Sequence, residues 1–132
     1  MKRGVGLDTC VVLRLLTGTP KEQSDQANAF LARCFARAEP VFVNDLVVAE
    51  VYHALLHFYA VPLKTAIRTL RSFLETPGIH ATGHASTVLA EYNGDAGAGL
   101  VDRLIRADLL THAGRLVTFD KDFRRLPGVT EL

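Results

Sequence analysis

Short apolar runs alternate with longer helical patterns along most of this chain, and this alternation constrains its fold more than any other feature. The runs 5–7, 41–43 and 116–119 consist mostly of apolar residues, and Asp or Asn follows each of them. Short apolar runs that end at turn or capping residues are typical of buried strands. Segments 79–82 and 129–132 are weaker strand candidates, the second at an edge.

The segments between these runs carry helical patterns. Proline precedes two of them, at positions 20 and 62, which suits the start of a helix. Gly114 is a typical helix stop. The predicted helices cover residues 9–16, 21–38, 45–60, 63–75, 85–92 and 100–113. Strands that alternate with helices predict an α/β fold with a parallel sheet flanked by helices.

Length and composition indicate one ordinary domain over residues 1–132. The chain is 48% hydrophobic and 22% charged, which excludes a disordered tail, and its formal net charge of +1 points to no particular class of partner.

No apolar stretch approaches the ~18 residues of a membrane span. Asp8 and Arg14 interrupt the only segment that resembles a signal peptide. Cys10 and Cys34 lack CxxC spacing and indicate a reduced, cytoplasmic protein.

Acidic residues follow the predicted strands, with Asp8, Asp45 and Asp120 just beyond their ends. In open α/β sheets, ligands bind beyond the carboxyl ends of the strands. We therefore expect Asp8 and Asp120 to project into the same crevice. Helix capping is the alternative role for both residues, because Asp is a common cap at a strand-to-helix turn.

Two further acids interrupt apolar helical stripes. Glu50 lies at helical spacing from Leu46 and is expected to face inward with it, and Asp102 shares a face with Ile105 and Leu109. An acid on an apolar face is costly unless it is paired or binds a cation. The alternative is that both acids lie at the margins of their stripes and are solvated.

If these four acids converge, they repel one another and raise one another's pKa values unless a divalent cation neutralises them. Carboxylate-rich sites with open water positions suit Mg²⁺ or Mn²⁺. Such sites serve phosphodiester hydrolysis, because the metal activates a water and stabilises the departing oxygen.

Four stretches of the sequence carry a resemblance to a known family. They are 6–9 with the following 11–16, then 47–51, 99–105 and 114–123. Together, in this order and at these separations, they resemble the PIN-domain nucleases, and in particular the VapC toxins of prokaryotic toxin–antitoxin pairs. Cys10 and Gly99 depart from the residues common at those positions in the family.

The resemblance implies a fold, an activity and partners. The fold is a three-layer α/β/α sandwich with a short parallel sheet, forming a single PIN-like nuclease domain. The activity is that of a Mg²⁺-dependent endoribonuclease, with Mn²⁺ as a second candidate metal. The partners are an RNA substrate, a cognate VapB-like antitoxin that blocks the cleft, and a second copy in a homodimer. The alternative is a catalytically inactive PIN-like domain that binds RNA or protein.

The same resemblance assigns site residues. Asp8, Glu50, Asp102 and Asp120 occupy the family's four acidic positions, as catalytic residues and metal ligands, with Asp8 and Asp102 the most direct. Thr118 matches a hydroxyl residue that supports this cluster.

Basic residues near the acids are candidates for holding RNA phosphates. Lys121, Arg124 and Arg125 follow Asp120 at the same rim. A second basic stripe on one predicted helix is either an RNA contact or a solvated face; it consists of Lys64, Arg68 and Arg71.

His53 and His57 lie four residues apart on the helix that carries Glu50. This spacing favours a packed or interfacial pair over a zinc or iron site, because no HExxH motif and no second Glu-x-x-His exist.

Overall fold

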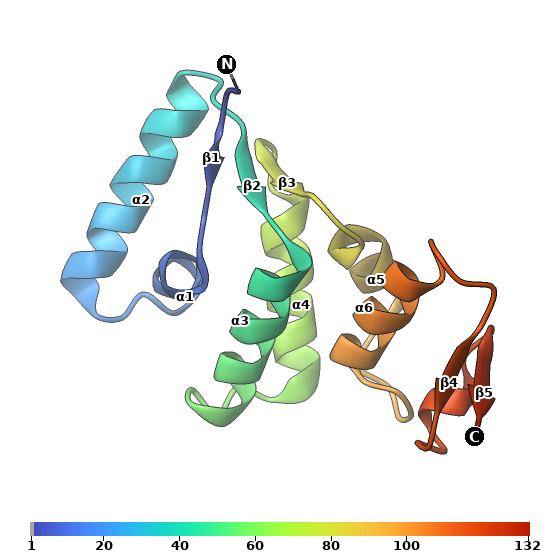
Figure 1. The fold of residues 1–132 in the computed structure, drawn as a ribbon. Helices are drawn as coiled ribbons and strands as arrows, with labels where there is room; N and C mark the ends of the chain where they lie inside the picture. Colours follow the sequence, from blue (N-terminus) through green and yellow to red (C-terminus); the bar gives the residue numbers. More distant parts are fainter. Residues whose placement is uncertain (1) are drawn as a thin grey trace.

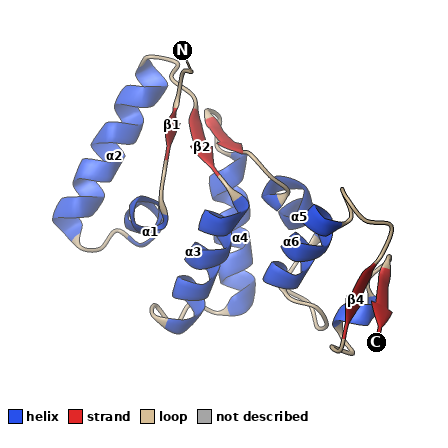
Figure 2. Ribbon diagram, viewed as in Figure 1, coloured by secondary structure: helices blue, strands red, loops and turns tan. Residues whose placement is uncertain are grey.

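Figure 1 shows the fold of the computed structural model, which describes residues 2–132. Helices and strands follow one another nearly as the sequence predicts, and Figure 2 distinguishes them by colour. The elements are β1 Val5–Gly6, α1 Thr9–Thr17, α2 Lys21–Ala36, β2 Val41–Val43, α3 Asp45–His57, α4 Leu63–Glu75, β3 Ile79–Ala81, α5 Ala85–Glu91, α6 Leu100–Leu109, β4 Leu116–Thr118, the 3₁₀ turn η1 Phe123–Arg125 and β5 Val129–Glu131.

A parallel sheet in the order β1-β2-β3 forms the centre of the fold. Val5 lies opposite Val41, and Val41 lies opposite Ile79, so the three strands end at one edge. The predicted α/β class with a short parallel sheet is confirmed. Both weaker strand candidates also form strands, as β3 and β5.

Strand β4 does not join this sheet. It pairs in parallel with β5, Leu116 opposite Val129, and the two form a separate two-stranded sheet. Figure 1 shows this second sheet at the far end of the molecule from β1, with α6 between them. The carboxyl end of β4 therefore does not share an edge with the end of β1.

The core lies against one face of the β1-β2-β3 sheet. Val41, Val43 and Ile79 on that face are at most 5% exposed. Helices supply the apolar side chains that pack there, including Val12, Leu13, Val51, Ile67 and Leu70. The opposite face carries Gly6 and His80, which are exposed, and Phe42, which is half-buried against Gly4.

Four helices end earlier than the sequence pattern predicts, α5 by a single residue. Helices α2 and α3 stop before Ala38 and Ala60, whose positive φ angles of 53° and 50° are incompatible with a continuing right-handed helix. Helix α6 ends at Leu109, where a turn follows in which the Thr111 hydroxyl donates to the carbonyl of Asp108 at 2.6 Å. None of the helices within residues 2–132 is long and apolar enough to cross a membrane.

Candidate active site

Asp8 follows β1 directly and caps helix α1. Its Oδ1 accepts a hydrogen bond from the backbone N–H of Val11 at 3.1 Å. The capping role weighed from the sequence is therefore present. Because this cap uses one oxygen of an exposed carboxylate, the second oxygen has no part in the cap.

Glu50 lies on the exposed side of α3 and is tied to the start of α1. The hydroxyl of Thr9 donates to Glu50 Oε1 at 2.7 Å, so Glu50 lies beside the residue that follows Asp8. The expectation that Glu50 faces inward with Leu46 is wrong. Helix α3 buries its Val51 and Leu55 side, whereas Leu46 is 75% exposed.

Asp102 and Asp120 form a second pair of acids. Asp102 stands in the first turn of α6 and is half-buried. Burial raises the pKa of its carboxyl, and the negative charge of Asp120 raises it further. A bound cation would relieve this repulsion.

The turn after β4 holds Asp120 in place. The backbone N–H of Asp120 donates to the hydroxyl of Thr118 at 2.9 Å. Asp120 Oδ1 in turn accepts from the N–H groups of Asp122 and Phe123, at 2.8 and 3.1 Å. Asp120 thus caps the turn that leads into η1, while Thr118 orients its backbone.

The structure places the four acids in two parts of the chain rather than in one cluster. Asp8 and Glu50 belong to the part built on β1 and α3, and Asp102 and Asp120 to the part built on α6 and β4. Within residues 2–132, no group of three or more His, Cys, Asp or Glu side chains is placed to hold a metal ion.

The expectation that Asp8 and Asp120 project into one crevice is therefore wrong within this chain, because β4 pairs with β5 instead of lying beside β1. The donor set itself suits a hard divalent cation, since all four side chains offer carboxylate oxygens. Within one copy of the chain, however, the four carboxylates do not meet at one place.

A groove of about 500 Å³ lies between α3 and α6. The helices that carry Glu50 and Asp102 form its two walls. Its lining is largely apolar and includes Leu46, Ala49, Val101, Leu104 and Ile105.

Asp45 has a role that the sequence pattern did not reveal. The cap of its own helix α3 is Asn44, which accepts from the N–H of Val47 at 2.9 Å. The Asp45 carboxylate instead accepts hydrogen bonds at 3.0 Å from the N–H groups of His84 and Ala85, at the start of α5. An acid just past a strand end is thus a structural cap for a helix 40 residues away in sequence.

The basic residues after Asp120 are exposed at the rim of the same turn. Arg124 pairs with Glu131 at 3.3 Å. No ion pair within residues 2–132 involves Lys121 or Arg125, whose charges therefore face solvent.

In the second basic stripe, on α4, Lys64 and Arg68 are exposed and Arg71 has a structural role. Arg71 donates to the carbonyl oxygens of Leu89 and Tyr92 and to the side-chain oxygen of Asn93. Lys64 lies 3.7 Å from Asp95. Arg71 therefore fills neither of the two roles that the sequence left open for this stripe, because its guanidinium holds the end of α5 in place.

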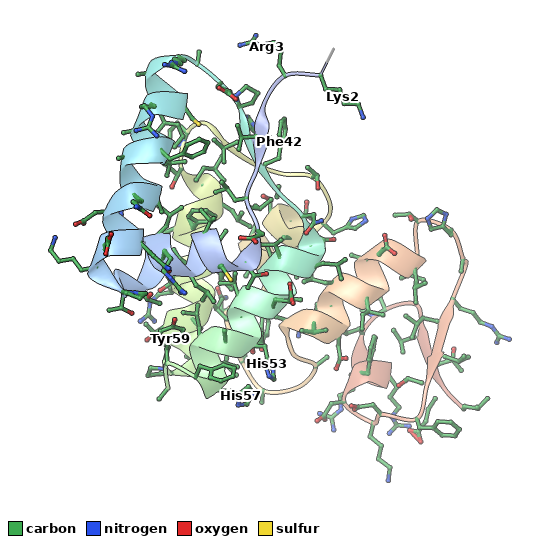
Figure 3. The ribbon with its side chains drawn as sticks, turned by 60° about the vertical axis from the view of Figure 1, so that its left-hand side comes forward. Lys2, Arg3, Phe42, His53, His57 and Tyr59 are labelled. Carbon is green, nitrogen blue, oxygen red and sulfur yellow. The ribbon has the colours of Figure 1, made fainter. Side chains whose placement is uncertain are left out.

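His53 and His57 form a ring pair on the surface of α3. Their ring centroids are 4.4 Å apart, both side chains are exposed, and Figure 3 shows them close to each other on the same helix. No third metal-binding side chain within residues 2–132 joins them.

Comparison with known proteins identifies the family. The PIN domain profile matches residues 5–129, a range that contains all four acids. A search of curated proteins found no match. PIN domains are generally nucleases and typically use divalent metal ions. With nearly its whole length matched, the chain belongs to the PIN-domain family.

Proposed function

We propose that this chain is a Mg²⁺-dependent endoribonuclease and the toxin of a type II toxin–antitoxin pair. The observation that carries the proposal is the PIN-domain match over residues 5–129, which includes every acid and hydroxyl residue assigned to the site. Nuclease activity is general to the family. RNA as the substrate, Mg²⁺ as the metal and the role of a toxin are parts of the proposal.

In this proposal, Asp8, Glu50, Asp102 and Asp120 hold the metal, with Mn²⁺ as an alternative to Mg²⁺. Asp8 and Asp120 each use Oδ1 for a cap and keep Oδ2 for a cation. Thr9 orients Glu50 by its 2.7 Å hydrogen bond. When bound, the metal lowers the pKa of a water and stabilises the oxygen that leaves phosphorus.

The basic rim serves the substrate. Lys121 and Arg125 follow Asp120 within a few residues and make no ion pair within residues 2–132, so they suit contacts with backbone phosphates. The chain has no Trp and only 8% aromatic residues, which favours recognition of RNA shape and backbone over base stacking.

Cleavage of a structured RNA by the purified full chain tests this activity. We expect cleavage with Mg²⁺ or Mn²⁺, none with EDTA, and none with Asp8→Asn or Asp102→Asn. Asp25→Asn is the matched control, because Asp25 is an exposed carboxylate on α2 whose partner is Lys21. Cleavage that survives EDTA or both site variants contradicts the proposal.

The toxin role is tested in cells. Expression of the chain alone in the bacterial cytoplasm is expected to arrest growth, and Asp8→Asn to relieve the arrest. Co-expression with a VapB-like antitoxin encoded beside the gene is expected to restore growth to the intact chain. Normal growth of cells that accumulate the folded, unaltered chain argues against a toxin.

An inactive PIN-like binding domain is the second candidate, because within residues 2–132 no three of the acids are placed to hold one metal ion. Calorimetric titration with Mn²⁺ separates the two functions. Stoichiometric binding that Asp102→Asn removes supports the nuclease, whereas absent metal binding with retained RNA affinity supports the binding domain.

A further inference from the structure

Strand β1 has an open outer edge. The N–H groups of Val5 and Leu7 donate to Pro40 and Phe42, so both point toward β2. Because backbone groups alternate in direction along a strand, the N–H and C=O groups of Gly6 point away from β2. No strand within residues 2–132 pairs with that side of β1.

Strand β4 has a matching open edge. The N–H of Leu116 donates to Gly128, and the carbonyl of Thr118 accepts from Leu132, so both residues bond toward β5. The N–H and C=O groups of Val117 consequently point to the opposite side. Parallel strands are normally found in larger sheets with covered faces, and a two-stranded sheet alone is marginal. The β4–β5 pair therefore lacks the neighbour that a parallel sheet needs.

The side chains beside the two edges are complementary as well. An open, largely apolar groove of about 490 Å³ runs along β1, and its walls include Val5, Leu7, Val11 and Phe30. On β4 and just beyond it, Val117 is 52% exposed and Phe119 is 79% exposed. These two residues alternate with Thr118 and so share one face of their strand.

We propose that β4 of a second copy pairs in parallel with the outer edge of β1, and that the exchange is reciprocal. The register that fits places the second copy's Val117 opposite Val5. The carbonyl of that Val117 then accepts from the N–H of Gly6, and the N–H of the following Phe119 donates to the carbonyl of Gly6. Val117 and Phe119 fill the groove along β1, and a five-stranded parallel sheet replaces two incomplete ones.

The second copy is favoured over the chain's own β4 by the position of α6. Figures 1 and 3 both show α6 between the main sheet and β4. To reach its own β1, the segment would have to pull α6 away and expose Leu100 and Leu104, which are 0% and 5% exposed. A second copy docks without breaking these contacts. Reciprocal docking also closes with two-fold symmetry, so it gives a dimer and no open-ended assembly.

The exchange has a consequence for the acids, and this part rests on the proposed function. In the same register, Asp120 of the second copy lies opposite Asp8, since each is three residues beyond the paired valines. Asp102, which already feels the charge of Asp120, belongs to the same exchanged part of the chain. Each site would then combine Asp8 and Glu50 from one copy with Asp102 and Asp120 from the other.

The oligomeric state of the full chain tests the docking without RNA or metal. We expect a dimer by light scattering, and we expect Val117→Lys and Phe119→Lys each to raise its dissociation constant at least tenfold. Both side chains are exposed in one copy, so the variants retain the fold, which circular dichroism verifies. Phe58→Lys is the matched control, because Phe58 is 83% exposed and lies outside both edges. A monomeric parent chain, or a dimer unaffected by the two variants, overturns the proposal.

A disulfide between two different chains tests the register and the exchange together. A tagged Val5→Cys chain and an untagged Val117→Cys chain are co-expressed, both with Cys10→Ser to remove the exposed native thiol; Cys34 is buried. We expect a disulfide-linked dimer that contains one chain of each kind. A single chain that carries both new cysteines and closes an internal disulfide as a monomer overturns the exchange.

These readouts keep the two proposals apart. A dimer that forms as expected but cleaves no RNA preserves the exchange and removes the nuclease function. RNA cleavage by a monomeric chain preserves the nuclease function and removes the exchange.

Discussion

The hydroxyl of Thr9 donates a 2.7 Å hydrogen bond to Oε1 of Glu50, across 41 residues of sequence. It joins the first turn of α1 to the exposed side of α3. This hydrogen bond fixes the end of β1, which Asp8 follows, relative to the helix that carries Glu50.

Replacing Thr9 by Val removes this bond and keeps the shape of the side chain. We expect a loss of about 1 kcal/mol in the free energy of unfolding, measured in urea. If Glu50 binds metal, the affinity for Mn²⁺ falls as well, because the carboxylate is no longer oriented. Thr87→Val is the control, since Thr87 is exposed on α5 and its side chain makes no hydrogen bond within residues 2–132. Equal effects of the two variants would refute a specific role for Thr9.

Asp45 is expected to matter for stability and not for chemistry. Its carboxylate accepts from two N–H groups at the start of α5, and it lies so close to Gly83 that a Cβ there would come within 2.5 Å of Asp45 Oδ2. Asp45→Ala should lower the free energy of unfolding by about 1–2 kcal/mol, the usual effect of losing a helix cap. Gly83→Ala should also destabilise, because the added methyl displaces this cap. Thermal unfolding of both variants, with Asp25→Ala as the control, measures these effects.

Arg71 fastens the C-terminal end of α5. Its guanidinium donates to the carbonyls of Leu89 and Tyr92, so Arg71→Met leaves two backbone acceptors without their partner. A loss of about 2 kcal/mol in unfolding free energy is expected. Arg68→Met, on the same helix, should change stability by less than about 0.5 kcal/mol, because Arg68 is exposed. RNA affinity that falls equally in both variants would instead assign the stripe to RNA.

Lys121 and Arg125 are expected to contact phosphates. Lys121→Ala and Arg125→Ala should each weaken RNA binding about equally for different sequences. Each should also reduce the slope of log affinity against log salt concentration by about 0.7–1. Filter binding at several salt concentrations gives this slope, and Arg37→Ala, at the exposed residue that follows α2, provides the control. Unchanged slopes would place the RNA elsewhere.

The raised pKa of Asp102 predicts a pH-dependent penalty on the folded state in the absence of metal. The ordinary pKa of an Asp carboxyl is 3.8, and burial and the charge of Asp120 raise the pKa of Asp102 in the folded protein. The folded state therefore binds the proton more tightly than the unfolded state, and stability is lost as the pH rises from about the ordinary pKa through the folded pKa.

Asp102→Asn removes this penalty. In EDTA, the variant is expected to be more stable than the parent chain at pH 7, and the difference should shrink as the pH falls toward 3.8. Urea unfolding across this pH range measures it. A parent chain that is the more stable of the two at pH 7 would show that Asp102 has a favourable partner.

Local patterns were enough to place most of the fold. The apolar runs became β1, β2 and β4, and Asp8 caps the helix that it precedes. These features depend on neighbours within a few positions along the chain, so periodicity and capping chemistry predict them. The family resemblance rests on the same local stretches, and the PIN-domain match over residues 5–129 agrees with it.

Features that depend on distant partners could not be read in this way. The pattern around Glu50 suggested an inward side chain, yet the buried side of α3 is set by what packs on Val51. Asp45 looks like a cap for its own helix and caps α5, because only the folded chain brings residues 84 and 85 beside it.

The pairing of β4 is the clearest case. Its sequence specifies an extended apolar segment, and such a segment can bond to any strand that presents a free edge. Backbone N–H and C=O groups are chemically the same in every strand, so they do not specify which strand pairs with β4. Pairing with β5 leaves the other edge of β4 open, and the packing of α6, which buries Leu100 and Leu104, holds that edge away from the chain's own β1.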